Sequence, residues 1–371
     1  MKNFITLFAA ALFLAVLFGC PADTNNPPQP ETSSTNIPTS TSSTSTTIEQ
    51  SVTTTTLPLS WSSNQTAPAI PNICMNVMPI GSTISFSSAT DGADVYLCIS
   101  DHSINAPENT IIWKKLDSIT LDHSGDWHIY SKATHSDFSD SPIIEMTVNV
   151  ASSFDSTTQS SIGKNVPTKW ATGYKDYVIG TYCTSESFQD PQKALGAAKG
   201  DRYDIVCLGN GGSITLSFDV NICDGEGADF AVFENGFNNQ FLELGFVSVS
   251  SDGEHFIRFD CVSLTDHTVD AFGSIDNTQI YNLASKYKQG LGTPFDLHEL
   301  RYRTEVLSGL VDLNHIRYIR IDDIIGDPQG GRDERDSFGN IVYDPYTVDP
   351  SIYTAGFDLD AIGVLNGNEA D

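Results

Sequence analysis

The sequence predicts an all-β protein, and three observations lead to this prediction. Short runs in which apolar and polar residues alternate recur after residue 70, and such alternation is typical of antiparallel strands with one buried face. Asp-Gly and Ser-Gly pairs separate several of these runs, as turns between strands require. Helical segments are few and short. We therefore expect a small β-sandwich followed by a larger jelly-roll-like β-sandwich with one or two short helices, after a disordered tether.

The first twenty residues, MKNFITLFAAALFLAVLFGC, have the layout of an export signal. A lysine precedes an apolar run, Phe4 to Phe18, that is too short to span a bilayer comfortably. The run ends in Leu-Phe-Gly-Cys, which resembles the lipobox of bacterial lipoproteins, where cleavage leaves the cysteine as the lipidated N-terminus. We expect residues 1–20 to be a lipoprotein signal peptide with lipidation at Cys20. An ordinary cleaved signal with an incidental cysteine is the alternative.

Residues 21–68 are a linker by composition. The tract is rich in Ser, Thr, Pro and Asn and almost lacks large apolar side chains, so burial could not offset the entropy lost on ordering it. A disordered tether of this length has a root-mean-square reach of roughly 40 Å. It would hold the folded part away from a membrane.

The charge balance restricts the class of partner. The 371 residues contain 19 Lys and Arg against 47 Asp and Glu, a formal net charge of −28. A chain of this charge repels polyphosphates, so we expect no nucleic acid partner. An acidic surface suits an exported protein of the cell envelope, anchored to a bacterial membrane by its lipid. It also supplies many of the hard oxygen ligands that Ca²⁺ prefers.

Cysteine usage predicts disulfides. Six cysteines follow Cys20, an even number that favours pairing in an oxidising compartment, and no C-x-x-C spacing indicates a metal–thiolate site. They are Cys74, Cys98, Cys183, Cys207, Cys223 and Cys261. We expect a Cys74–Cys98 disulfide in the first folded unit, with the other four pairing in the second. Buried free thiols are the alternative.

Residues 70–150 form the predicted small β-sandwich. The motifs Gly81–Phe86, TDGADVYLCISD and SKATHSDFSDSPI resemble a β-sandwich module found at the C-terminus of chitobiase and β-hexosaminidase enzymes. Members of that family have a Tyr-Tyr-Thr centre where this chain has Tyr96-Leu97-Cys98. The resemblance covers residues 73–150 and implies a non-catalytic spacer.

Residues 165–371 form the predicted larger domain, with helices near YNLASKYKQG and PFDLHELR. The motifs GADFAVFENGF, LELGFVSVSSDG and GFDLDAIGVLN resemble a family of exported bacterial cell-surface proteins of unassigned function. The layout is also similar to galactose-binding, discoidin-like jelly rolls. That second resemblance, of fold alone, implies carbohydrate or other ligand binding at loop tips and a structural calcium ion.

The sequence carries no motif of a hydrolase. It has neither a G-x-S-x-G elbow nor an H-E-x-x-H helix. The acids that flank the apolar run FAVF, Asp229 and Glu234, would stand roughly 16 Å apart on opposite faces of a regular strand, too far apart for a glycosidase pair unless a bulge intervenes. We therefore expect no enzyme. Other acids that meet only in space remain as an alternative.

A stretch rich in acids and glycines, residues 322–360, is the predicted metal site. Its spacing does not match an EF-hand, yet Ca²⁺ tolerates irregular sets of six to eight oxygens. The candidate ligands are Asp323, Asp327, Asp336, Asp344, Asp358 and Asp360. A solvated loop whose acids pair with Arg332 and Arg335 is the alternative. Asp358 and Asp360 would share one face of the last strand, and a cation, Arg320 or backbone amides would relieve their repulsion.

Glu234 and Asn235 are the predicted ligand-binding residues, because they open an Asn-rich loop at one end of the sandwich. Aromatic residues at loops could stack on a sugar; the candidates are Phe237, Tyr343, Tyr346 and Tyr353. The sequence thus predicts a surface-anchored, non-catalytic lipoprotein that binds carbohydrate or another extracellular ligand, with structural calcium. A structural or adhesive envelope protein is the first alternative, and a glycoside-active hydrolase is the second.

Overall fold

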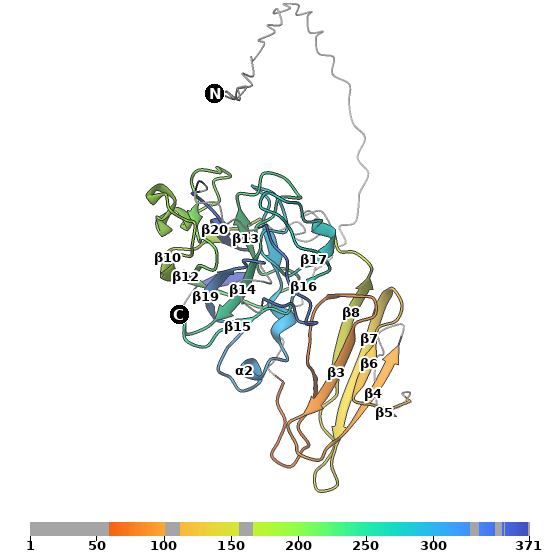
Figure 1. The fold of residues 1–371 in the computed structure, drawn as a ribbon. Helices are drawn as coiled ribbons and strands as arrows, with labels where there is room; N and C mark the ends of the chain where they lie inside the picture. Colours follow the sequence, from red (N-terminus) through yellow and green to blue (C-terminus); the bar gives the residue numbers. More distant parts are fainter. Residues whose placement is uncertain are drawn as a thin grey trace, which may run out of the picture. The chain divides into compact units, whose positions relative to one another are not determined.

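Strands dominate the computed structural model, which describes residues 59–100, 112–155, 166–326, 334–345, 351 and 353–369 (Figure 1). The helices are single turns, so the predicted all-β class is confirmed. All of these residues belong to one compact unit. A helix long and apolar enough to cross a membrane does not occur in these ranges. Cys20, the linker up to residue 58, and Asp327 lie outside the described residues.

Two sheets form the N-terminal sandwich. The three-stranded sheet has the order β1 (Ala69–Pro71), β3 (Thr83–Ser88), β6 (Ser118–Thr120). The five-stranded sheet has the order β2 (Val77–Pro79), β8 (Ile144–Ala151), β7 (Gly125–Thr134), β4 (Asp94–Ser100), β5 (Lys114–Lys115). Strand β8 alternates regularly between buried and exposed residues, so one face packs on the core and the other faces solvent.

Two buried acids of the C-terminal part bind the segment that links β1 to β2. Asp260 accepts a hydrogen bond from the backbone N–H of Cys74 at 3.1 Å. Glu299 accepts one from the backbone N–H of Asn76 at 2.6 Å and another from the Tyr281 hydroxyl at 2.7 Å. These bonds give buried backbone donors of the N-terminal sandwich partners from the other part of the chain.

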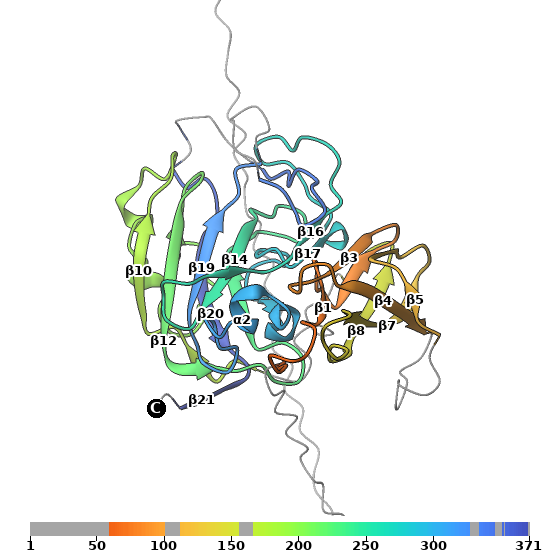
Figure 2. The same ribbon diagram turned by 90° about the horizontal axis from the view of Figure 1, so that it is seen from below.

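Two larger antiparallel sheets form the C-terminal sandwich. The first has the order β10 (Gly173–Val178), β12 (Ser213–Ile222), β19 (Ile316–Asp323), β14 (Gly245–Ser250), β15 (Ile257–Arg258), and β21 (Gly367–Glu369) also pairs with β12. The second has the order β11 (Val206–Cys207), β20 (Asp358–Val364), β13 (Phe230–Glu234), β18 (Thr293–Phe295), and β9 (Lys169–Trp170) also pairs with β20. Figure 2 shows β10, β12, β19 and β14 side by side. A separate hairpin pairs β16 (Val262–Ser263) with β17 (Ile280–Tyr281).

Strand β13 explains why the FAVF motif is apolar on both faces. Phe230 and Val232 belong to the main core between the two sheets, whereas Ala231 and Phe233 pack in a second cluster with Trp170. All five residues of the strand are buried. The Phe230 ring stacks on Phe295, with 5.2 Å between ring centroids. A strand with two covered faces cannot show hydrophobic alternation.

The short helices differ from the prediction in one place. The segment PFDLHELR contains the expected turn, a 3-10 helix η4 (Leu297–Leu300), and the one-turn helix α2 (Thr304–Leu307) follows it. The helix expected at residues 281–290 is wrong, because this segment is irregular. Asn282 and Ser285 have φ angles of 53° and 66°, which a right-handed helix cannot include. The Lys286 side chain is buried there and donates to the Ile280 carbonyl at 2.7 Å.

All six cysteines after Cys20 are free thiols in the structure, so the expected Cys74–Cys98 disulfide is absent. The two residues have different surroundings. Cys74 lies among charged groups of the C-terminal part, including Arg301 and Asp260, whereas Cys98 lies in β4 near Lys114. Because the β1–β2 segment packs on the C-terminal sandwich, Cys74 lies beside residues of that sandwich and not beside Cys98.

Truncation of Phe230 should destabilise the C-terminal sandwich strongly. We expect Phe230→Ala to lower the free energy of unfolding by about 3–5 kcal/mol, because the ring is fully buried between Phe295 and Phe259. Urea denaturation of the exported chain measures this change. Tyr203→Ala is the control, since this ring is 68% exposed, and it should stay within about 0.5 kcal/mol. Equal effects of both substitutions would contradict the assigned core.

Candidate functional site

A pocket of about 120 Å³ lies at the end of the C-terminal sandwich where β13 ends and β20 begins. Its lining combines polar groups with aromatic rings. The residues are Asn235, Phe237, Phe241, Glu243, Ala271, Phe272, Pro345, Thr354, Ala355 and Asp358. The antiparallel register places the end of β19 opposite the start of β14, so the same sandwich end also receives residues from the first sheet.

Five buried acids gather at this end of the two sheets. They are Glu234, Glu243, Asp323, Asp344 and Asp358, each at most 8% exposed. Glu234 is the last residue of β13, Asp323 the last of β19, and Asp358 the first of β20. The β13–β20 register shifts between Phe233 and Glu234, so Glu234 sits at a bulge. Buried carboxylates normally occur with a partner that offsets the loss of water.

Asp323 is satisfied by backbone donors. One of its oxygens accepts from the Gly211 N–H at 2.6 Å and the other from the Phe357 N–H at 2.7 Å. These contacts connect the end of β19 to the turn before β12 and to the residue before β20. Asp323 therefore acts as a structural anchor beneath the pocket.

The other four acids of the cluster keep unused acceptor capacity. Glu234 Oε2 accepts from the Gly236 N–H and the Ser285 hydroxyl, both at 2.7 Å. Asp344 Oδ1 accepts from a backbone N–H, and Asp358 Oδ2 accepts from the side-chain amide of Asn235 at 3.0 Å.

The second oxygen of each of these three carboxylates lacks a hydrogen-bond partner among the described residues. These atoms are Glu234 Oε1, Asp344 Oδ2 and Asp358 Oδ1. The Glu243 carboxylate likewise accepts no hydrogen bond from the described part of the chain. Buried acceptors without partners are rare in native proteins, so a bound group is the expected explanation. Because Glu243 and Asp358 also line the pocket, the pocket is the candidate site.

Burial and mutual repulsion make the ionised form of these acids unfavourable. Loss of solvent raises the pKa of Glu234 to about 8 and that of Asp358 to about 8. Burial and then the charge of Asp358 raise the pKa of Glu243 well above its ordinary value. Burial and then the charge of Asp323 do the same to the pKa of Asp344. At neutral pH the cluster therefore holds protons or requires a cation.

The predicted metal ligands fall into two groups. Asp323, Asp344 and Asp358 belong to the buried cluster, whereas Asp336 and Asp360 have other partners. Asp336 accepts from the backbone N–H groups of Phe338 and Asn340 at 2.9 and 2.8 Å, which shapes a turn. Asp360 accepts from the Lys199 and Gly200 N–H groups at 3.0 and 2.9 Å. The repulsion between Asp358 and Asp360 was predicted to be relieved by a cation, by Arg320 or by backbone amides. For Asp360 it is backbone amides that stabilise the carboxylate.

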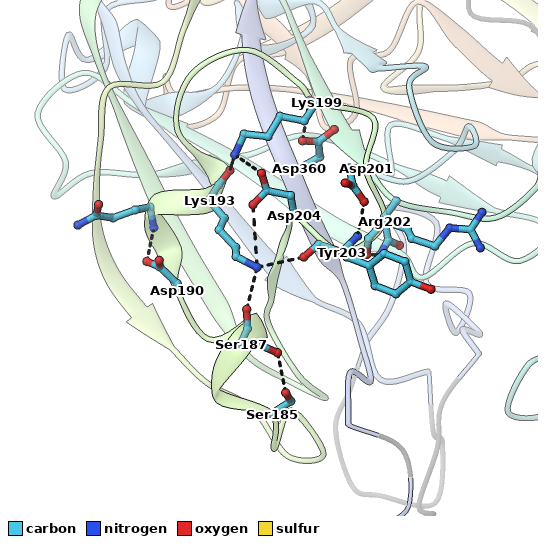
Figure 3. Close-up of polar contacts among 12 residues, drawn as sticks. Ser185, Ser187, Asp190, Lys193, Lys199, Asp201, Arg202, Tyr203, Asp204 and Asp360 are labelled. Atoms are coloured by element: carbon cyan, nitrogen blue, oxygen red, sulfur yellow. Dashed lines mark hydrogen bonds and ion pairs between the residues drawn. The ribbon is translucent and has the colours of Figure 1, made fainter.

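The loop before β11 positions Asn235, and Figure 3 shows the contacts of Lys193, Lys199 and Asp204 that brace this loop. Asp204 pairs with Lys199 at 2.9 Å and with Lys193 at 4.0 Å. Lys193 also donates to the Tyr203 carbonyl of the loop and to the Ser187 carbonyl, at 3.0 and 2.8 Å. Within the loop so braced, the Arg202 carbonyl accepts from the Asn235 amide at 3.2 Å. Asn235 is therefore held between Arg202 and Asp358, as a binding residue at a pocket wall requires.

Three phenylalanine rings stack at the pocket. The rings of Phe237 and Phe241 lie 5.8 Å apart, and those of Phe241 and Phe272 lie 5.9 Å apart, with interplanar angles near 20°. Phe237 is 56% exposed and Phe272 is 68% exposed. Phe272 has a φ of 62°, a left-handed conformation that is unfavourable for a bulky residue and often marks a functional site. These rings form an exposed apolar platform beside the carboxylates.

Sequence patterns predicted only part of this site. Asp358 was a predicted metal ligand, and Glu234, Asn235 and Phe237 were predicted to bind a ligand, whereas Glu243, Phe241 and Phe272 were not predicted. The available signal was weak: Glu243 alternates with Leu242 and Leu244 just before a strand, where an acid at a buried position is unexpected. Of the other aromatic candidates, Tyr353 is exposed, Tyr343 packs against a core cluster, and Tyr346 lies outside the described residues.

An acidic cluster away from the pocket has the compactness of a metal site. Among the described residues, Asp224, Asp229 and Asp296 offer ligand atoms within 4.8 Å of one another. All three already have partners. Asp229 accepts from the Gly225 and Leu297 N–H groups at 2.9 and 2.7 Å, Asp296 accepts from the His298 N–H group at 2.9 Å, and Asp224 contacts the His298 ring at 3.3 Å. Asp229 thus caps the glycine-rich turn before β13. No three acids of the pocket converge as closely, so an ion there would take at most two of them together with other oxygens.

A larger hollow of about 860 Å³ also occurs, between β8 and residues 298–315. Its polar groups are already partnered: Asp224 contacts His298 at 3.3 Å, and Arg301 donates to the His298 carbonyl at 2.7 Å. Much of its remaining lining is aliphatic. It lacks the combination of unused carboxylate oxygens and exposed rings that marks the smaller pocket.

Comparisons with known proteins do not assign a family. No family model matches the chain, and no curated protein matches it. Among solved structures, SusE-like protein BT2857 gives a TM-score of 0.28 at 9% identity, over 80% of this chain and 99% of that chain. A structure described as "Structural basis for the promiscuous specificity of the carbohydrate-binding modules from the beta-sandwich super family" gives 0.18 at 10% identity, over 83% and 94% of the two chains. Scores this low carry no argument about function, which rests on the site geometry.

The buried acids predict that the protein loses stability as the pH rises. In the unfolded chain Glu234 and Asp358 ionise near 4.5 and 3.8, whereas in the folded chain both hold protons until about pH 8. The folded state therefore binds extra protons, and the stabilisation present below pH 4 is lost as the pH rises through 8.

Urea denaturation in EDTA should show this loss. We expect the free energy of unfolding to fall by several kcal/mol between pH 5 and pH 9, about 4 kcal/mol for each carboxyl group that stays protonated up to pH 8. Glu234→Gln should reduce the slope, whereas Glu226→Gln, at an exposed position, should leave it unchanged. A stability that increases over this range would contradict the assignment.

Proposed function

We propose that the C-terminal sandwich is a non-catalytic domain that binds an extracellular carbohydrate at this pocket, beside a calcium ion. One observation carries the proposal: the pocket combines two buried carboxylates, Glu243 and Asp358, with an exposed stack of three phenylalanine rings, and Asp358 Oδ1 has no partner among the described residues. The first feature is suited to a cation and the second to the flat apolar face of a sugar.

The chemistry of the donor set favours calcium. The polar groups that line the pocket are carboxylate, amide and hydroxyl oxygens, without a histidine or cysteine. Such hard oxygen donors suit Ca²⁺, whereas Zn²⁺ prefers nitrogen and sulfur. Glu243 and Asp358 would hold the ion, and other oxygens would complete its coordination. A bound cation would also offset the repulsion that raises the pKa values of the buried acids.

The aromatic stack and the pocket size favour surface binding of a sugar over catalysis. A volume of about 120 Å³ is well below the roughly 300–1,000 Å³ of sites that enclose a small ligand. A ligand would therefore rest on Phe237 and Phe272 with only one group inserted toward Asp358. Rings that are already stacked lose little conformational freedom when a ligand binds.

We also propose the cellular context from the N-terminal sequence. The signal peptide and lipobox-like Cys20 support export and lipidation, and the linker up to residue 68 would act as a tether. The domain would then present its pocket at the envelope of a bacterial cell.

Calcium should stabilise the protein. We expect EDTA to lower the melting temperature and excess Ca²⁺ to restore it, because a ligand at 100 times its Kd adds about 2.7 kcal/mol to the free energy of unfolding. Glu243→Gln and Asp358→Asn should each abolish this response in differential scanning fluorimetry. Asp219→Asn, an exposed acid on β12, should retain it. Identical melting curves of the wild-type protein with EDTA and with Ca²⁺ would overturn the calcium assignment.

Carbohydrate binding can be tested on a glycan array with the exported chain in Ca²⁺. Loss of one stacking ring should reduce affinity by about tenfold, equivalent to about 1.4 kcal/mol, in Phe237→Ala and in Phe272→Ala. Phe138→Ala, which removes an exposed ring from the N-terminal sandwich, should bind normally. Absence of any glycan signal, or an equal loss in the Phe138 variant, would argue against the proposal.

A further inference from the structure

Two of the free thiols lie together. Cys183 and Cys207 belong to the same small apolar cluster with Ile205, and both are buried. The Cys183 Sγ atom lies 3.6 Å from the Cys207 carbonyl oxygen, and the two thiol groups are within hydrogen-bonding reach of each other.

The other four described thiols have no cysteine among their contacts. Cys223 donates to the Asn314 carbonyl at 3.2 Å, and Cys261 lies beside Asp336. Cys74 is surrounded by charged groups, and Cys98 lies near Lys114. The tertiary structure therefore selects one pairing from those that the sequence left open.

The pair lies directly behind the candidate site. Cys207 is paired with Asp358 in the β11–β20 register, and its Sγ atom lies 3.2 Å from the Ala355 carbonyl. Cys183 forms an isolated backbone bridge with Thr354. Thr354, Ala355 and Asp358 all line the pocket, so the two cysteines lie behind its wall.

We propose that Cys183 and Cys207 form a disulfide in the exported protein and that this bond braces the pocket wall. The two thiols lose two protons and two electrons as the S–S bond forms. The oxidant is the disulfide of a thiol–disulfide oxidoreductase in the export compartment, which accepts both electrons and protons and leaves as a dithiol. Exchange takes place during folding, before β11 covers the sulfur atoms.

The bond has two consequences for the site. It closes a loop between residues 24 positions apart, which restricts the unfolded chain and fixes the segment that carries Cys183 against β11. It also fixes the backbone of Cys207, which the β11–β20 register pairs with Asp358, so that this carboxylate is held in position for a cation in the pocket. The disulfide itself is independent of the proposed function, whereas its effect on calcium affinity rests on it.

Disulfide mapping tests the bond without any ligand. The exported chain is purified from an oxidising compartment, alkylated without reduction, digested and analysed by mass spectrometry. We expect one linked peptide pair, Cys183 with Cys207, and alkylated Cys74, Cys98, Cys223 and Cys261. Alkylation of Cys183 and Cys207, or a bond to any other cysteine, would overturn the proposal.

Thermal unfolding and calcium titration test the consequences. Reductant should lower the melting temperature of the wild-type protein by several degrees. The double variant Cys183→Ala, Cys207→Ala should show no such decrease. The control variant Cys98→Ser should respond to reductant as the wild type does. If the double variant fails to fold, the comparison of oxidised and reduced wild-type protein decides. Calcium affinity should be at least threefold higher in the oxidised protein. Equal affinities in the two states would overturn the coupling, while the mapping result decides on the disulfide.

Discussion

The structure depends on buried carboxylates that accept hydrogen bonds from backbone N–H groups. The strands are short and the connections between them irregular, so many buried donors have no partner in a sheet. Asp323 satisfies two of these donors, before β12 and before β20, and so connects the two sheets. Asp229 does the same for the turn before β13 and the start of η4, and Glu299 extends this arrangement to the N-terminal sandwich. An acid can serve two or more donors at once, which explains the value of acids in such loops.

Buried carboxylates bonded to backbone donors also form the candidate site. At the pocket end of the sandwich the carboxylate oxygens outnumber the donors that reach them, and unused oxygens remain on Glu234, Asp344 and Asp358. Each has one oxygen committed to the fold, which holds the other in place. In the proposed site a cation would complete such a cluster more readily than a protein group, since Lys and Arg side chains are scarce in a chain with 19 of them against 47 acids. The fold thus pre-organises a charged pocket.

Local patterns predicted those parts of the fold in which local residues decide the outcome. Alternation along β8 identified a strand with one buried face, and the FAVF motif marked a buried strand. The pattern failed at residues 281–290, where helix-forming residues adopt an irregular path because Lys286 is buried and Ser285 donates to Glu234. It also grouped Asp360 with Asp358, although Asp360 is satisfied by the loop at Lys199. In both places contacts between segments distant in the sequence override local preference.

The sequence by itself determined the all-β class, the strongly acidic character and the supply of oxygen ligands near the C-terminus, because composition and periodicity are local properties. Only the tertiary structure decided which acids meet. Asp358 lies far from Glu234 and Glu243 in the sequence, and it reaches them because the antiparallel register brings the end of β13 and the start of β20 to one edge of the sandwich. The same register places Cys207 beside Asp358. Contacts between distant segments determine which strands pair and in which register, so the spacing of residues along the chain does not predict it.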